Sequence, residues 1–237
     1  MRTVVFLAVS FAVCANAQEP RRVAIDVGHF LAEPGASSAR GRPEFEFNRE
    51  LAGAIRDALE ADGLHTALIG ADGKMSVLSR RTAAARGADF LLSVHHDSVQ
   101  PQYLAKWQHE GEVWLYSDRY AGFSLFVSRR NPRLKASLAC ASAIGAGLRA
   151  AGFTPSLYHA EPIAGESKPF ADHANGVHYY DNLVVLHTAT QPAVLLEAGV
   201  IVNRSEELKL REATTQRRIA AAVAIGVRDC LGGRTQL

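Results

Sequence analysis

Three short apolar runs constrain the fold of this chain most, because each ends in an ionisable residue. They are VAIDVGH ending at His29, FLLSVH ending at His95, and AVLLE ending at Glu197. Runs of aliphatic and β-branched residues of this length are typical of strands buried in an α/β sheet. Since ligands of open α/β folds bind outside the carboxyl ends of the strands, we expect these three side chains to meet at one edge of a sheet.

Strand-like and helical patterns alternate along the rest of the chain. An amphipathic helix is expected over residues 48–62, and another that Asn131 caps and Pro132 opens. The alternation predicts a single α/β domain in which helices flank a mainly parallel twisted sheet. The other expected elements are strands at residues 22–27, 65–70, 90–95, 111–117 and 193–200, and helices at 77–86 and from about 205 to 232.

The first 17 residues have the pattern of a secretory signal peptide. They carry one arginine, an apolar run over residues 4–13, and the small residues Ala15 and Ala17 before the expected cleavage point. The run is shorter than the roughly 18 residues of a membrane-spanning helix, and no later stretch reaches that length. We therefore expect residues 18–237 to form the mature domain, with no membrane span, in the periplasm or otherwise secreted.

Composition bears on two properties of the chain, nucleic-acid binding and disulfide formation. The formal net charge is only +2 and the basic residues are scattered, which predicts no nucleic-acid partner. Cleavage of the signal peptide removes Cys14 and leaves Cys140 and Cys230. An even number of cysteines in an exported chain permits a disulfide, but two buried free thiols would give the same sequence pattern.

Two histidines and two glutamates together would supply the groups of a hydrolytic zinc site. Such a site has three protein ligands and an open fourth position, and a remaining carboxylate can act as general base. Glu197 ends an uncharged run, where a carboxylate without a partner is costly to bury. The acidic ligand is ambiguous from the residues alone, because Glu44, Glu46 and Glu50 stand close together. A structural reading also remains, with His29 capping a strand and Glu197 in a buried salt bridge.

Four segments resemble zinc-dependent N-acetylmuramoyl-L-alanine amidases, in the order that this family has them. They are VAIDVGH, EFEFNRELAGAI, LSRRTAAARGADFLLSVHHDS and QPAVLLEAGVIVNRSEEL, and the resemblance covers residues 22 to about 231. The family usually has proline at Val27 and glycines at Phe30 and Leu31, so the loop after the first strand is expected to differ in shape.

The resemblance implies a zinc cofactor, its ligands and a base. His29, Glu44 and His95 would bind Zn²⁺, because the family places its acidic ligand four residues before the asparagine found here at Asn48. Glu197 would be the catalytic base. Residues 18–237 would then form the zinc amidase catalytic domain. His96 would point to the opposite face of its strand from His95, and Arg81, which matches a family arginine, is expected to be structural.

The implied reaction is hydrolysis of peptidoglycan at the amide bond between the lactyl group of N-acetylmuramic acid and L-alanine of the stem peptide. A zinc peptidase acting on stem peptides would use the same groups. A non-catalytic wall-binding protein on the same scaffold is a third reading, although mere binding requires no general base at Glu197.

Residues 154–182 are rich in proline and glycine and show no sustained period, which predicts a long irregular loop. Some amidases of this family hold an occluding helix in the corresponding region until a partner protein removes it. The composition here favours an open or substrate-shaping loop, and it leaves the need for a protein activator open. The loop carries His159, His173 and His178, and the histidine that follows it, His187, fits either a substrate contact or a surface position at a strand end. Asp97 fits either a turn residue or an acceptor that orients a metal ligand.

Overall fold

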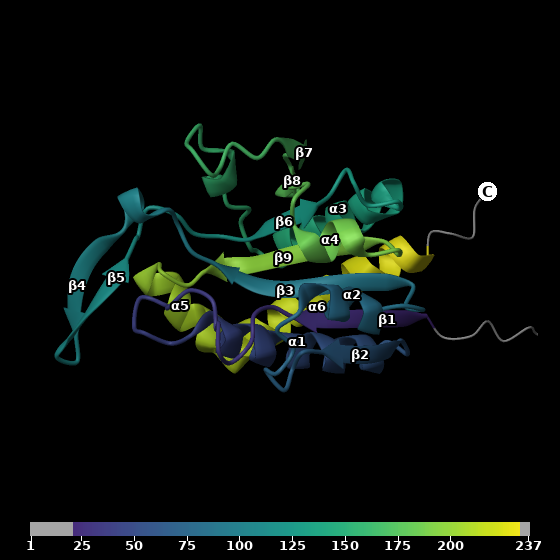
Figure 1. Ribbon diagram of the computed structural model, residues 1–237, viewed down its shortest axis with the longest axis horizontal. Helices are drawn as coiled ribbons and strands as arrows, with labels where there is room; N and C mark the ends of the chain where they lie inside the picture. The colour runs from purple at the N-terminus through teal and green to yellow at the C-terminus, as the bar shows by residue number, and fades with distance from the viewer. Residues whose placement is uncertain (1–20, 233–237) are drawn as a thin grey trace, which may run out of the picture.

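The computed structural model describes residues 21–232, and its centre is a seven-stranded sheet (Figure 1). The strand order is β2-β1-β3-β9-β6-β8-β7. The strands are β1 Arg22–Val27, β2 His65–Ile69, β3 Phe90–Asp97, β6 Ser124–Val127, β7 Phe170–Asp172, β8 Val177–Tyr179 and β9 Ala193–Val200. The expected signal peptide lies outside the described residues.

Most neighbouring strands of this sheet run parallel. β1 pairs in parallel with β2 and β3, β3 with β9, and β6 with β8, whereas β6–β9 and β7–β8 are antiparallel. The predicted α/β class and mainly parallel sheet are therefore confirmed. Because β1, β3 and β9 run in the same direction, their carboxyl ends lie at the same edge of the sheet, on the left in Figure 1.

Helices cover both faces of the sheet. Behind it in Figure 1 lies α6, Ala213–Gly232, which packs with α1, Glu44–Ala61, and α3, Leu134–Ala150, over the larger core cluster. In front lie the short helices α2, Leu78–Ala84, and α4, Val184–Thr188, over a smaller apolar cluster.

A two-stranded hairpin projects from the carboxyl edge of the sheet (Figure 1). It consists of β4, Ala105–His109, and β5, Glu112–Tyr116, which pair antiparallel. Trp107 Nε1 donates a hydrogen bond to the carbonyl of Ala39 at 2.7 Å, and the Arg204 guanidinium lies 3.9 Å from the Tyr116 ring centroid. These contacts attach the hairpin to the loop before α1 and to α5, Arg204–Arg211.

Several predicted helix boundaries were wrong. Helix α1 begins at Glu44 rather than at residue 48, so Glu44 sits in its first turn. Helix α3 begins at Leu134, although the Asn131 side chain still accepts a hydrogen bond from the Arg133 amide at 2.7 Å. The single helix expected from 205 to 232 is two helices, because Glu212 between them has an extended backbone with φ −72° and ψ 124°.

Residues 154–182 are only partly irregular, contrary to expectation. The segment adds strands β7 and β8 to the edge of the sheet and contains one 3-10 turn at Tyr158–Ala160. No longer helix occurs between these residues, all of which are described, so the expected absence of a helical plug here is confirmed. His187 lies in α4, so the strand-end position considered for it was wrong.

A disulfide answers the question that the two cysteines left open. Cys140 of α3 is bonded to Cys230 of α6, with their Cα atoms 4.9 Å apart. The bond joins two helices that pack against each other behind the sheet. Among the described residues, no helix has the length and apolar character needed to cross a membrane.

Candidate metal centre

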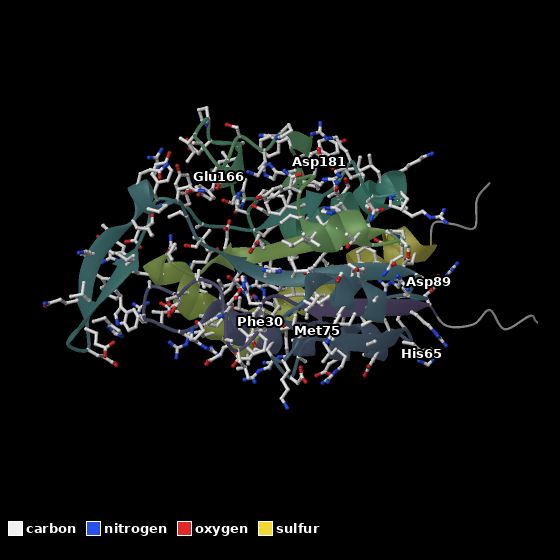
Figure 2. The ribbon with its side chains drawn as sticks, in the orientation of Figure 1. Phe30, His65, Met75, Asp89, Glu166 and Asp181 are labelled. Atoms are coloured by element: carbon white, nitrogen blue, oxygen red, sulfur yellow. A yellow bond between two sulfur atoms is a disulfide. The ribbon has the colours of Figure 1, made fainter. Side chains whose placement is uncertain are left out.

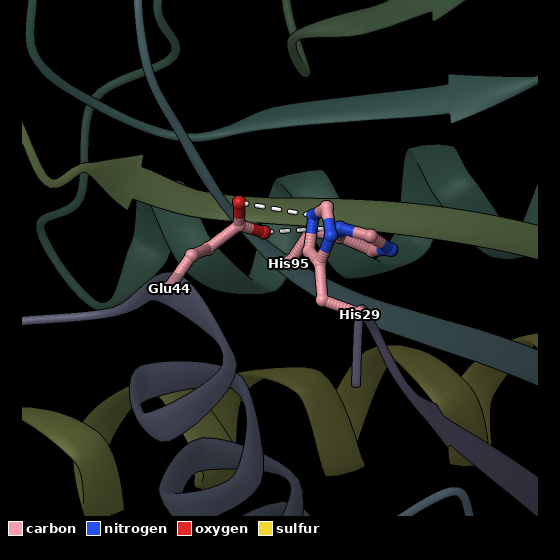
Figure 3. Close-up of side chains that lie close together, drawn as sticks. All are labelled: His29, Glu44 and His95. Carbon is pink, nitrogen blue, oxygen red and sulfur yellow. Dashed lines mark hydrogen bonds and ion pairs between the residues drawn. The ribbon is translucent and has the colours of Figure 1, made fainter. Parts of the chain in front are cut away.

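His29, Glu44 and His95 come together at the carboxyl edge of the sheet (Figure 3). One possible ligand atom from each lies within 4.8 Å of the others. His29 Nε2 is 3.0 Å from Glu44 Oε2, and His95 Nδ1 is 3.1 Å from Glu44 Oε1. The two imidazole rings meet edge to face, with centroids 5.0 Å apart. Two imidazole nitrogens and a carboxylate are a donor set that fits a zinc ion.

The two histidines dominate the electrostatics of Glu44. Its side chain is buried, and burial by itself raises the pKa of a carboxyl group. Hydrogen bonds from His29 and His95 outweigh that effect and hold the pKa of Glu44 well below its usual range. The carboxylate is therefore kept ionised, which is the form that binds a metal.

Three further donors fix the Glu44 carboxylate. Asn48 Nδ2 donates to Oε1 at 3.0 Å and the His96 amide donates to the same oxygen at 3.3 Å, while the Ala36 amide donates to Oε2 at 3.2 Å. Asn48 Oδ1 accepts a hydrogen bond from His96 Nδ1 at 2.8 Å. Burial lowers the pKa of His96 to about 3. His96 is thus a buried neutral support, on the other face of β3 from His95.

Glu46 and Glu50 lie away from this cluster. Both pair with Arg42, Glu46 through a 2.9 Å contact to Nε, and both side chains are exposed. Of the three acidic residues left ambiguous by their spacing, only Glu44 approaches the two histidines. Because α1 begins at Glu44, the next turn of the helix brings Asn48 beneath the same carboxylate.

The turn after β1 aims His29 at Glu44. The backbone of His29 is left-handed, with φ 67°, whereas Gly28 does not have a positive φ. Gly28 is needed because a Cβ there would lie 2.3 Å from His95 Cε1. Gly35 has φ 82°, and a Cβ there would lie 2.4 Å from Glu44 Oε2. The two glycines leave room for the cluster.

Glu197 lies on β9 beside the cluster, at the register position of His95 on β3. Its Oε2 atom is buried and has no hydrogen-bond partner among the described residues. Burial, followed by the negative charges of Asp97 and Glu44, raises the pKa of Glu197 well above its usual value. The salt-bridge reading of this residue is wrong, since no Lys, Arg or His pairs with it in the described part of the chain.

The other histidines lie outside the three-residue cluster. His159 Nε2 is 2.7 Å from Asp97 Oδ2, and its Nδ1 is 2.8 Å from Glu166 Oε2. Asp97 thus binds the 154–182 segment, which neither sequence interpretation anticipated. Glu166 lies in the upper half of Figure 2 and Phe30, which follows His29, in the lower half. His178 is buried against Phe126 and Phe170, with ring centroids 5.7 and 4.2 Å away.

Asn48 and His96 support the Glu44 carboxylate, and sequence reasoning assigned neither of them this role. Asn48 gave a usable signal, because it stands one helical turn after Glu44. The role of His96 could not be inferred, since it depends on the contact between α1 and β3.

Residues 23–229 match the N-acetylmuramoyl-L-alanine amidase family, and the chain therefore belongs to it. A probable N-acetylmuramoyl-L-alanine amidase of Haemophilus influenzae, AmiB, is 26% identical over 97% of this chain. The chain spans only 56% of the length of that relative.

Solved structures of amidases have the same fold. The catalytic domain of CwlV, an N-acetylmuramoyl-L-alanine amidase from Bacillus (Paenibacillus) polymyxa var. colistinus, is 26% identical, with a TM-score of 0.67 over 90% of this chain and 98% of that one. The amidase Ami1 of Mycobacterium smegmatis is 21% identical, with a TM-score of 0.71 over 90% of this chain and 97% of that one.

Proposed function

We propose that this chain is a zinc-dependent peptidoglycan amidase that acts outside the cytoplasm. It hydrolyses the amide bond between the lactyl group of N-acetylmuramic acid and L-alanine of the stem peptide. The observation that carries this proposal is a carboxylate oxygen, Oε2 of Glu197, that is buried without a partner among the described residues, on the strand next to a cluster of two histidines and a glutamate. Membership of the amidase family supports the choice of substrate, and the signal-peptide pattern of residues 1–17 supports export.

His29, Glu44 and His95 would hold the zinc ion. The ion would supply a Lewis acid that polarises the amide carbonyl and lowers the pKa of water. Glu44, kept ionised by its neighbours, contributes the negative charge of the site. Asn48 and the backbone amides of Ala36 and His96 hold this carboxylate in one orientation, as partners of a metal ligand commonly do.

Glu197 is the general base in this proposal. A raised pKa suits a group that must both accept and release a proton near neutral pH. Glu197 accepts a proton from the attacking water and later returns it to the departing amine of L-alanine. Its unpartnered oxygen is free to receive that proton, which a carboxylate engaged in a salt bridge would not be.

Variants of Glu197 and His29 separate the two roles. Glu197→Gln keeps the size of the side chain but cannot accept the proton, so turnover should fall at least about 100-fold while bound zinc is retained. His29→Ala should lose zinc and activity together. Zinc content by atomic emission and hydrolysis of purified muropeptides measure both. Loss of zinc from Glu197→Gln would instead identify Glu197 as a ligand.

The products of wall digestion distinguish the amidase from the peptidase. Mass spectrometry should find a muramic acid lactyl carboxylate and peptides with a new L-alanine amino terminus. New reducing sugar ends are not expected, because the two carboxylates near Glu197 are engaged elsewhere, Glu44 with His29 and His95 and Asp97 with His159, and neither is free for glycoside chemistry. Release of D-alanine, or cleavage within the stem with the lactyl amide intact, would assign the site to a peptidase.

A further inference from the structure

Arg81 of α2 is a buried arginine, 1% exposed, whose guanidinium reaches the turn that carries His29. Nη1 donates to Asp26 Oδ1 at 2.7 Å and to the carbonyl of Val27. Nη2 donates to the carbonyl of His29, and to the carbonyl of Met75 at 2.7 Å. One side chain therefore holds the last residues of β1, the candidate ligand itself and the loop before α2.

Neighbouring residues orient the ion pair of Arg81 and leave space for its guanidinium. Ser93 Oγ donates to Asp26 Oδ2 at 2.7 Å, which orients the carboxylate towards the guanidinium. A Cβ on Gly70 would lie 2.9 Å from Arg81 Nη1, so the absence of a side chain there leaves the channel for the guanidinium. Met75, whose carbonyl accepts the bond from Nη2, and Phe30, which follows His29, are labelled in Figure 2.

His29 requires such support because of its backbone. The left-handed backbone conformation is unfavourable for a residue with a Cβ, and it persists only where its surroundings enforce it. At φ 67° the His29 imidazole reaches Glu44. Relaxation of this turn to negative φ would redirect the ring.

We infer that Arg81 is a positioning residue for the candidate metal centre. Its planar fork binds the carbonyls of Val27 and His29 on either side of Gly28, and this fixes the left-handed turn that presents His29 to the metal. The inference rests on the proposed function, since it concerns the zinc ligands of that same site. Arg81 itself touches neither the cluster side chains nor the position of the substrate amide.

A purely structural role would require only the ion pair with Asp26. Lysine can retain that pair, but it cannot reproduce a rigid fork that donates to several acceptors at once. Arg81→Lys therefore separates the two roles, because it preserves the buried charge and removes contacts to the carbonyls. Asp26→Asn is the complementary change, since it removes the carboxylate that anchors Nη1, so the guanidinium is no longer held against the carbonyls of Val27 and His29.

Asn131→Ala is the matched control. Asn131 is also buried, and its Nδ2 holds three carbonyls, those of Leu186, Ala189 and Gln191, at 2.8, 3.3 and 3.2 Å. It contacts no part of the cluster. Its loss should lower the melting temperature of the zinc-free protein, as loss of any buried hydrogen-bonding group does, without changing zinc affinity.

The experiment measures the zinc dissociation constant of each purified full-length variant by competition with a chromophoric chelator. Arg81→Lys and Asp26→Asn should bind zinc about 10 to 100-fold more weakly than wild type, the range typical for partners of metal ligands. Saturating zinc should restore part of the activity of Arg81→Lys. The part that stays lost should appear as a lower kcat than that of wild type, with KM unchanged. Asn131→Ala should match wild type in zinc affinity.

Each failure has its own signature. If the zinc affinity of wild type is no higher than that of His29→Ala, the metal centre is refuted, and this inference is refuted with it. If wild type binds zinc and Arg81→Lys binds it equally well, the proposed function stands and the positioning role is refuted. A loss of affinity in Asn131→Ala as large as that in Arg81→Lys would also refute it, because the effect would then reflect general destabilisation.

Discussion

Single residues without side chains decide whether the histidine and glutamate donors can meet. At Gly28, a Cβ would lie 2.3 to 2.6 Å from three atoms of the His95 ring. Real Cβ atoms do not approach other atoms so closely, so either the ring or the β1 turn must move. The ring is itself held between Glu44 and His29, and any movement would disrupt the donor set.

We predict that Gly28→Ala weakens zinc binding strongly and destabilises the fold by about 1–3 kcal/mol, the usual cost of overpacking. Zinc titration and urea denaturation measure the two effects. Gly53→Ala is the control, because a Cβ on this α1 residue meets nothing within 4 Å. That change should be neutral or stabilising by about 0.4–1 kcal/mol. Normal zinc affinity in Gly28→Ala would show that the His95 ring position is not critical.

The candidate cluster could be anticipated at the residue scale because each strand run ended in its functional side chain. Strand ends are visible in a sequence as the point where an apolar run meets a polar residue. Glu44 had no such signal, since it opens a helix among other acidic residues, and only the family resemblance separated it from Glu46. The left-handed backbone of His29 and the fork of Arg81 had no local signal, because both depend on contacts between distant segments.

At the scale of elements, long periodic segments were predictable and short ones were not. The strands β1, β3 and β9 and the helix α1 were anticipated because their apolar residues repeat over several turns or fill a whole strand. Strands β4, β6, β7 and β8 were missed, and the last three have only 3 or 4 residues each. Their pairing is decided by neighbouring strands, which a local pattern does not contain.

The disulfide between α3 and α6 gives a prediction for these two helices. It spans 90 residues of sequence, and Cys140 is buried. Replacing both cysteines by alanine should lower the free energy of unfolding by about 2–5 kcal/mol, the range for native disulfides. Urea denaturation measures this loss.

The same double variant should keep the zinc affinity of wild type, because α3 and α6 pack behind the sheet and contribute no donor to the cluster. Reduction of the wild-type protein provides a second route to the same state. Two thiols that can be alkylated in the native, unreduced protein would contradict the bond, and unchanged stability in the variant would contradict its role.

At the scale of the whole molecule, a buried network joins the sheet to the 154–182 segment. His159 lies between Asp97, at the end of β3, and Glu166, while the Tyr158 hydroxyl lies 3.1 Å from the same Glu166. The rings of Phe126 and His178 pack against His159, with centroids 4.8 and 6.0 Å away. This network fastens the 154–182 segment to Asp97, whose negative charge acts on Glu197.

The network makes stability depend on pH in the alkaline range. Burial by itself would lower the pKa of His159, but Asp97 and Glu166 outweigh it and raise this pKa to about 9, compared with 6.5 for an ordinary histidine. The folded state therefore binds the proton more tightly than the unfolded state. The resulting stabilisation is complete below about pH 6.5 and is lost as the pH rises through about 9.

We predict that the free energy of unfolding of wild type falls by on the order of 3 kcal/mol as the pH rises from 6.5 through about 9. His159→Gln, which cannot carry the charge, should be less stable than wild type at pH 6, and the difference should shrink as the pH rises past 9. Urea denaturation across this range measures both curves.

His65→Gln is the control, since His65 is exposed at the amino end of β2, on the right of Figure 2. A difference between wild type and His159→Gln that stays constant with pH would mean that Asp97 and Glu166 hold a neutral imidazole, and the 154–182 segment would then be fastened by hydrogen bonds alone.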